Sequence, residues 1–348
     1  MRDRRELAEP GRRRFLTRLG MAGGAGGAAV LGRGVVAGGA ETAGPDHDGG
    51  TPVHGAMDHG GLGTVGTVDH ARNGFDPSAI LTDFDGGAVS RDAAGRTVRE
   101  YEIVAFPRRI EVAPGVFFEA WTYNGRVPGP TIRATEGDRV RITFRNGSPH
   151  PHTMHFHGIH PAEMDGVPGA GEAQPGETFV YDFVAEPFGT HLYHCHSSPL
   201  KSHIHRGLYG AFVVDPPGGR PPAHEMVMVL NGFDTDFDGS NEVYAANTVA
   251  FAYVDRPIRL RAGELQRLHL VNVTEFDPVN SLHLHANFFQ LYRTGTALTP
   301  SELTDTVTMG QAERHMLEFT YRAPGRFMFH AHQTEFVELG WMSFFEVT

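Results

Sequence analysis

The sequence predicts an all-β protein built from two β-sandwich domains. Its 348 residues include 44 Gly and 23 Pro, a content that favours turn-rich β structure over long helices. From Tyr101 onward, short segments with an apolar residue at every second position recur, as half-buried strands require. The chain shows no long amphipathic helical pattern, so both cores are expected to form between sheets.

A Pro- and Gly-rich run divides the strand-forming part of the chain. In residues 138–145, which follow a turn cluster at 124–130, polar and apolar residues alternate as in a strand with one buried face. Residues 216–222 contain four Pro and cannot continue a sheet. The strand pattern returns at 224–230, 265–273, 316–321 and 342–347. We therefore predict a first domain over residues 96–216 and a second over 223–348.

The N-terminal part of the chain has the features of a targeting segment. Arg12, Arg13 and Arg14 precede Phe15, Leu16 and a short apolar run rich in Gly and Ala. This order is typical of a signal peptide, and the paired Arg resemble a twin-arginine export signal. We predict a twin-arginine signal peptide over 1–40 and export to the periplasm or the cell exterior. The apolar run is too short for a membrane span, and residues 41–95, rich in Gly, Asp and Thr, are predicted to be a flexible linker.

Composition excludes several classes of function. The formal charge of −11 argues against a nucleic-acid partner, because such proteins gather Lys and Arg to neutralise phosphates. A single Cys rules out an intramolecular disulfide. The chain contains 21 His, and His is the commonest metal ligand, so a metal site is the first functional expectation.

Eight of these histidines form four pairs in which the two His are separated by one residue. Alternate residues of a strand point to the same face, so each pair presents two imidazoles together. Two of these four pairs lie in each predicted domain. They are His155 and His157, His194 and His196, His283 and His285, and His330 and His332.

The single Cys lies inside one of these pairs. Cys195 stands between His194 and His196, and on a strand its side chain points to the opposite face. With His152 and His203 it makes the two-His, one-Cys set of a trigonal blue copper site. The axial position, five residues after His203, is Leu208. Leu208 cannot bind copper, which predicts a raised reduction potential.

In these motifs the chain resembles the multicopper oxidases, most closely their two-domain, small laccase-like branch. The resemblance covers about residues 100–348 and rests on the four His pairs, on Cys195 with His203 and Leu208, and on residues 124–132 and 137–138. In three-domain laccases the last domain holds the blue, or type 1, copper. The corresponding positions here are Asn280, Ala331 and Phe336, so the type 1 copper is expected in the first domain.

The resemblance implies the rest of the expected site. It implies two cupredoxin-like Greek-key β-sandwich domains and four coppers per chain: one type 1, one type 2 and two type 3. It assigns the type 2 copper to His155 and His283, and the type 3 pair to the other six paired His. It also implies dioxygen as electron acceptor, a phenolic, aromatic amine or metal-ion donor, and a homotrimer whose trinuclear clusters lie between subunits.

Two acidic residues are candidate proton donors. Asp165 follows His157 by eight residues, and the family keeps an Asp-Gly at about this distance. We expect Asp165 to orient a water or to supply protons, although an Asp before Gly is also typical of a turn. Glu335, shortly after His332, is the second candidate.

Three other functions remain as alternatives. A copper nitrite reductase has a similar domain plan but would carry Asp at position 155 and a small apolar residue at 196, where this chain has His. A copper-binding electron-transfer protein would need one type 1 site and not four His pairs. A zinc hydrolase is disfavoured by Cys195 and by the absence of a helical His motif with Glu.

Overall fold

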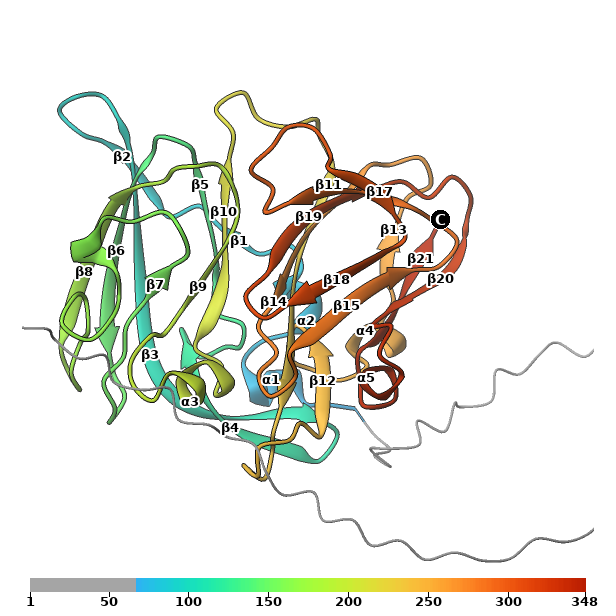
Figure 1. The fold of residues 1–348 in the computed structure, drawn as a ribbon, viewed down its shortest axis with the longest axis horizontal. Coiled ribbons are helices and arrows are strands. Elements are labelled where there is room, and N and C mark those ends of the chain that lie inside the picture. The colour runs from blue at the N-terminus through green and yellow to red at the C-terminus, as the bar shows by residue number, and fades with distance from the viewer. Residues whose placement is uncertain (1–66) are drawn as a thin grey trace, which may run out of the picture. The chain divides into compact units, whose positions relative to one another are not determined.

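The structure, a computed structural model, describes residues 67–348 (Figure 1). This part of the chain consists mainly of strands, arranged in four sheets that use residues 84–215 and 224–347 in separate pairs. The prediction of an all-β protein is confirmed. The expected signal peptide at 1–40 and the first part of the expected linker lie outside the described residues.

The first sandwich contains the strands before residue 216. One sheet has the order β1–β5–β10–β9–β7, with strands Phe84–Asp85, Thr131–Thr135, Tyr209–Asp215, Gly189–His194 and His155–Phe156. The other has the order β2–β3–β6–β8, with Ala88–Arg91, Thr97–Ala113, Arg139–Asn146 and Thr178–Val184, while β4 (Val116–Tyr123) pairs with β3. In β6, Val140, Ile142 and Phe144 are buried and the intervening residues exposed, as its alternation predicts.

The second sandwich contains the strands after residue 223. One sheet has the order β12–β11–β14–β19–β16–β17, with Val243–Ala246, His224–Phe233, Gln266–Asn272, Arg314–Phe319, Phe289–Arg293 and Glu302–Thr304. The other has the order β13–β21–β20–β15–β18, with Ile258–Leu260, Met342–Val347, Gly325–His330, Val279–Leu284 and Thr306–Gly310. Every residue of β14 is buried. Its two faces contribute to two apolar clusters, one inside this sandwich and one shared with the first.

Helices are short throughout the described residues. They are α1 (His70–Asn73), α2 (Pro77–Ile80), a 3-10 turn at Ala162–Met164, α3 (Leu200–His205), α4 (Ala252–Asp255) and α5 (Thr334–Glu338). Between residues 67 and 348, none is both long and apolar enough to cross a bilayer.

The prediction of a flexible linker is wrong for residues 67–95, which fold onto both sandwiches. Asp69 and Asp76 cap α1 and α2, and β1 pairs with β5 of the first sandwich. Ile80 is buried among apolar residues of both sandwiches, and the Leu81 carbonyl accepts a hydrogen bond from the Val227 amide of β11. The sparse apolar residues here show no period because they fill gaps between the sandwiches.

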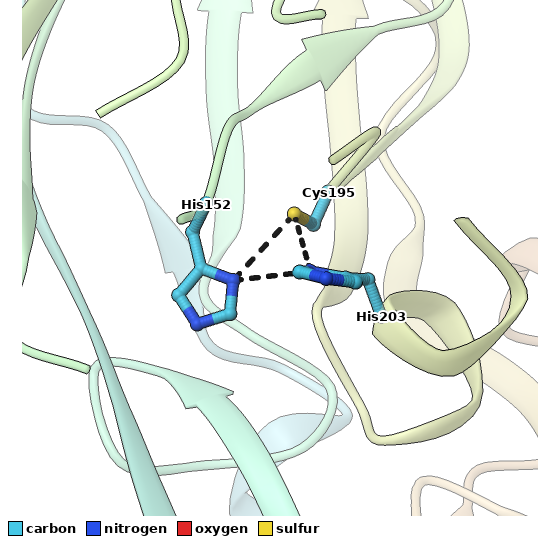
Figure 2. A group of neighbouring side chains, drawn as sticks. All are labelled: His152, Cys195 and His203. Carbon is cyan, nitrogen blue, oxygen red and sulfur yellow. Dashed lines mark hydrogen bonds between the residues drawn. The ribbon is translucent and has the colours of Figure 1, made fainter. Parts of the chain in front are cut away.

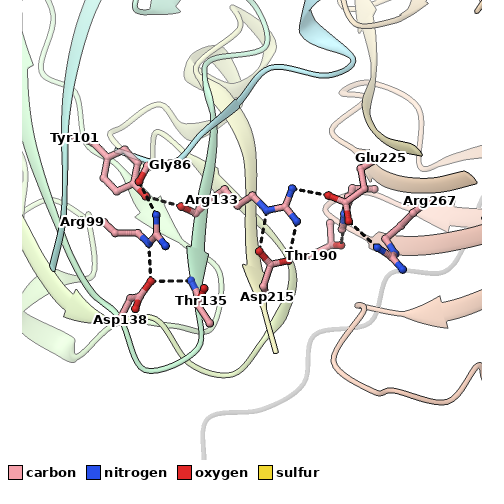
Figure 3. A network of polar contacts seen from close by, with 11 residues as sticks. Gly86, Arg99, Tyr101, Arg133, Thr135, Asp138, Thr190, Asp215, Glu225 and Arg267 are labelled. Atoms are coloured by element: carbon pink, nitrogen blue, oxygen red, sulfur yellow. Dashed lines mark hydrogen bonds and ion pairs between the residues drawn. The ribbon is translucent and has the colours of Figure 1, made fainter. Parts of the chain in front are cut away.

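A network of charged side chains joins the two sandwiches (Figure 3). Arg133 of β5 makes a bidentate pair with Asp215 of β10, at 2.8 and 3.0 Å, and a further pair with Glu225 of β11. Glu225 also pairs with Arg267 of β14 at 2.6 Å, and Arg267 pairs with Glu318 of β19 at 2.6 Å. Burial raises the pKa of Glu225, but the two guanidiniums outweigh burial and leave that pKa below its ordinary value.

Replacing Arg267 with Met is expected to destabilise the protein by about 3–5 kcal/mol, because the carboxylates of Glu225 and Glu318 lose this ion-pair partner. The Arg267 side chain is only 3% exposed. The measurement is the urea midpoint of unfolding at pH 7. Arg259→Met is the control, since Arg259 is 86% exposed and lies 3.9 Å from Glu346. An equal effect of both substitutions would show that the network adds no stability of its own.

Candidate metal centres

The first centre consists of His152, Cys195 and His203, whose side chains point toward one another (Figure 2). The Cys195 sulfur lies 3.1 Å from Nδ1 of His203 and 3.7 Å from Nδ1 of His152. The two Nδ1 atoms are 3.1 Å apart. All three residues are buried. The structure therefore brings together, from three separate segments, the set that the sequence predicts.

Local structure explains how the three side chains meet. Cys195 directly follows β9, and its amide donates to the Leu208 carbonyl at 2.9 Å. His203 lies on α3, and His152 lies in a bridge to Ala173. Leu208 is fully buried in the same apolar cluster as Cys195. An apolar residue therefore neighbours Cys195 in the core of the first sandwich.

Thr153 is a contact of the sulfur that the sequence did not reveal. Its amide donates to the Cys195 sulfur at 3.3 Å, and its hydroxyl lies 3.7 Å from the same atom. The hydroxyl also accepts from the His196 amide at 2.7 Å. Hydrogen bonds to the ligand sulfur tune a copper–thiolate site. No sequence signal exposes this contact, because it joins residues 42 positions apart.

Burial sets the protonation of the first centre. It lowers the pKa of His152 to about 3, assisted by the charge of His203, and it lowers the pKa of His203 to about 4. Burial also raises the pKa of the Cys195 thiol. Both imidazoles are therefore neutral near pH 7 and able to bind a metal, whereas the thiolate needs a bound cation to offset its burial.

The second centre gathers His155 and His157 with His194 and His196, the two named pairs of the first sandwich. Pairing of β7 with β9 sets His155 opposite His194. Nε2 of His157 lies 2.9 Å from Nε2 of His194, and the ring of His196 lies 5.3 Å from that of His155. His194 is anchored through Nδ1, 2.8 Å from the Cys195 carbonyl. Cys195 thus belongs to the first centre while its two neighbours belong to the second.

The third centre repeats this arrangement in the second sandwich. Pairing of β15 with β20 sets His283 opposite His330. Nε2 of His285 lies 3.0 Å from Nε2 of His330, and the ring of His332 lies 5.5 Å from that of His283. His283 is oriented by Thr306, whose hydroxyl lies 2.9 Å from its Nδ1. The two sandwiches therefore present equivalent imidazole groups.

Within the described part of one chain, the second and third centres are separate. His155, His157 and His194 form one group of ligand atoms within 4.8 Å of one another, and His283, His285 and His330 form another. His285 is exposed to solvent. One chain therefore presents two separate groups of imidazoles.

The two predicted proton donors differ in position. Asp165 lies beside the second centre, with its carboxylate 3.1 Å from Nδ1 of His155 and 3.5 Å from Nε2 of His160. Its backbone carbonyl lies 2.6 Å from the same Nδ1. Glu335 lies on the exposed first turn of α5 and belongs to none of the ligand groups found among residues 67–348. The structure thus places Asp165, but not Glu335, against a His.

Comparison with known proteins decides the family. Residues 108–219 and 220–348 match two family models, each described as multicopper oxidase. The chain belongs to the multicopper oxidase family. The predicted family and its cupredoxin-like sandwich fold are thereby confirmed, and the chain is a copper oxidoreductase.

Individual relatives cover two branches of copper proteins. A crystal structure of a multicopper oxidase is 57% identical, with a TM-score of 0.80 over 81% of this chain and 100% of that one. A probable nitrite reductase–hydroxylamine oxidoreductase fusion protein of Kuenenia stuttgartiensis is 30% identical over 71% of this chain, which spans 31% of its length. A copper-containing nitrite reductase of Neisseria meningitidis is 27% identical over 70% of this chain, which spans 67% of it.

The residues of the first centre fit copper. A soft sulfur and two neutral imidazole nitrogens, converging from three sides in a buried site, are the donor set that copper prefers in electron-transfer sites. The second and third centres supply imidazoles only, which suit copper as well. The three centres are therefore candidate copper sites.

Proposed function

We propose that this multicopper oxidase is laccase-like. It couples one-electron oxidation of a phenolic, aromatic amine or metal-ion donor to four-electron reduction of dioxygen to water. The observation that carries the proposal is the position of Cys195: its sulfur faces His152 and His203, while His194 and His196 on either side face the second centre. A few covalent bonds therefore join an electron-accepting site to a site rich in imidazoles.

The proposed copper complement is four per chain. His152, Cys195 and His203 would hold the type 1 copper, with Leu208 as a non-ligand. The trinuclear cluster takes the eight paired His, with the type 2 copper on His155 and His283 and the type 3 pair on the other six. When bound, these ions supply one-electron transfer at the first centre and multi-electron reduction at the cluster.

The protein is proposed to assemble as a homotrimer with clusters between subunits. The separation of the second and third centres within a chain supports this, because each centre alone supplies only four of the eight His of the proposed cluster. The exposed position of His285 on its sandwich supports it as well. A first sandwich of one copy would then meet the second sandwich of the next.

Protein groups orient the site and manage protons. The contact of Asp165 with His155, 3.1 Å from carboxylate to Nδ1, supports a role in holding that ring and in exchanging protons with nearby water. Glu335 remains proposed as a second donor on sequence grounds alone.

The twin-arginine signal over 1–40 and export of the protein are likewise proposed from the sequence, as is the division into domains at 96–216 and 223–348.

Nitrite reduction is the second candidate, because several relatives are nitrite reductases. His155 and His196 argue against it. His196 lies 5.7 Å from His194 and 5.3 Å from His155, ring to ring, so it adds an imidazole where a single type 2 copper has no need of one. A copper-binding electron-transfer protein would leave both His-only centres unused.

The proposal is tested by elemental analysis of copper-loaded protein, together with acceptor assays. We expect about four coppers per chain and donor oxidation that consumes dioxygen. A chelator-stripped sample serves as the control. About two coppers per chain, with donor oxidation sustained by nitrite under argon, would refute the oxidase assignment and favour nitrite reduction.

A further inference from the structure

A pocket of about 530 Å³ opens beside the second centre, between the two sandwiches. One side is formed by the four His of the first sandwich. The other side comes from the second sandwich, from residues that follow β14 and β18: Val273, Glu275, Gln311 and Ala312. Glu275 is the sole carboxylic acid in this lining. The second sandwich thus brings an acid to a His group of the first sandwich in the same chain.

Glu275 is held in a buried position by its neighbours. The residue is 8% exposed, and its side chain is hydrogen-bonded to Gln311. Its backbone carbonyl accepts from the Asn241 side chain at 2.7 Å. The next residue, Phe276, packs its ring 3.9 Å from the ammonium of Lys201. The acid therefore lies on a loop fixed from both sides.

The charges around Glu275 leave it able to carry a proton. Burial raises the pKa of its carboxyl, and the Gln311 hydrogen bond and the Lys201 charge oppose that rise only in part. Lys201 is exposed and lines the same pocket, so water reaches this edge. A carboxyl with a raised pKa, between water and a pocket lined by His, is suited to general acid catalysis.

We propose that Glu275 is a proton-relay residue that delivers protons to the pocket during dioxygen reduction. The inference rests on the function proposed above. Reduction of one dioxygen to two waters breaks the O–O bond and forms four O–H bonds. Four electrons come from the donor, and the protons pass from the Glu275 carboxyl. Its carboxylate then recovers each proton from water at the Lys201 edge.

The primary test compares Glu275→Gln with the control Glu186→Gln, which alters an exposed acid of the first sandwich. We expect Glu275→Gln to slow dioxygen uptake by about 100-fold, with copper content and the blue absorption band unchanged. Reduction of the blue site by donor under argon should keep its wild-type rate. Glu275→Asp, which retains an acid, should recover part of the uptake rate. Glu186→Gln should behave as wild type.

Infrared spectroscopy gives a readout independent of turnover. The carbonyl stretch of a protonated carboxyl should persist to higher pH in wild type and in Glu186→Gln than in Glu275→Gln. Gln311→Leu removes a hydrogen bond that lowers the pKa of Glu275. Because the acid must be protonated to donate, this variant should move the alkaline limb of dioxygen reduction to higher pH.

The outcomes separate this inference from the proposed function. Equal uptake by Glu275→Gln and wild type would overturn the relay and leave the oxidase intact. Loss of copper from both Glu275→Gln and Glu275→Asp would make Glu275 a structural residue and also overturn the relay. Absence of dioxygen uptake by the wild-type protein would refute the oxidase function itself, and the relay with it.

Discussion

Replacing Cys195 with Ser is expected to abolish the blue absorption band and to lower donor oxidation by several orders of magnitude. The sulfur is the sole thiol of the chain and lies 3.1 Å from His203. A serine hydroxyl does not provide the soft thiolate that such a site requires. The fold should survive, because the two side chains are similar in size and the Thr153 amide can donate to the new oxygen. Visible absorption, copper content and circular dichroism measure these effects.

The matched control for Cys195→Ser is His150→Gln. His150 is exposed and packs on Trp121 near the first centre, but it is not among the proposed ligands. This variant should retain the blue band. Survival of an intense thiolate-to-copper band in Cys195→Ser would contradict the assignment, since no other thiol could produce it.

Replacing His283 with Ala is expected to spare the blue band and to stop dioxygen reduction. His283 belongs to the third centre, in the other sandwich from Cys195. Its loss removes an imidazole from the proposed cluster and leaves the first centre untouched. The experiment reduces the blue site with donor under argon and then admits dioxygen. The wild-type colour should return, whereas that of His283→Ala should stay bleached for at least about 100 times longer.

His224→Gln is the control for this variant, because His224 lies in the same sandwich, on β11, and contacts Gln266 rather than the paired His. Its colour should return at the wild-type rate. Normal reoxidation of His283→Ala would remove the second sandwich from the oxygen-reducing site. Sedimentation of both variants should give the wild-type mass, which separates a lost ligand from a lost trimer.

Much of the fold could be predicted from local pattern. The alternation in β6 depends only on the period of an extended chain, and the structure buries Val140, Ile142 and Phe144 as that period requires. The same period predicts that His194 and His196 share a face and that Cys195 takes the opposite one. Strand geometry therefore allows the candidate ligands to be identified from the sequence before any tertiary contact is known.

Residues without a regular period give no sequence signal of the contacts they make. Phe75 and Ile80 fill the junction of the two sandwiches; the sequence marks them as an apolar patch but does not specify the surface on which they pack. The sequence gives no signal for Thr153 or Glu275, because each meets its neighbours across a long stretch of chain. Thr153 donates to the Cys195 sulfur, and Glu275 lines a pocket with four His of the first sandwich. Their neighbours in sequence carry no sign of these contacts.

The sequence by itself determined the two sandwiches and the candidate copper ligands, because short-range spacing on a strand dictates which side chains share a face. Tertiary structure decided three further matters. It placed the eight paired His in two separate groups, joined the sandwiches through Arg133, Glu225 and Arg267, and brought Glu275 into the pocket that His155 also lines. These depend on how distant segments pack, and packing is set by the summed shape and charge of many residues rather than by any local repeat.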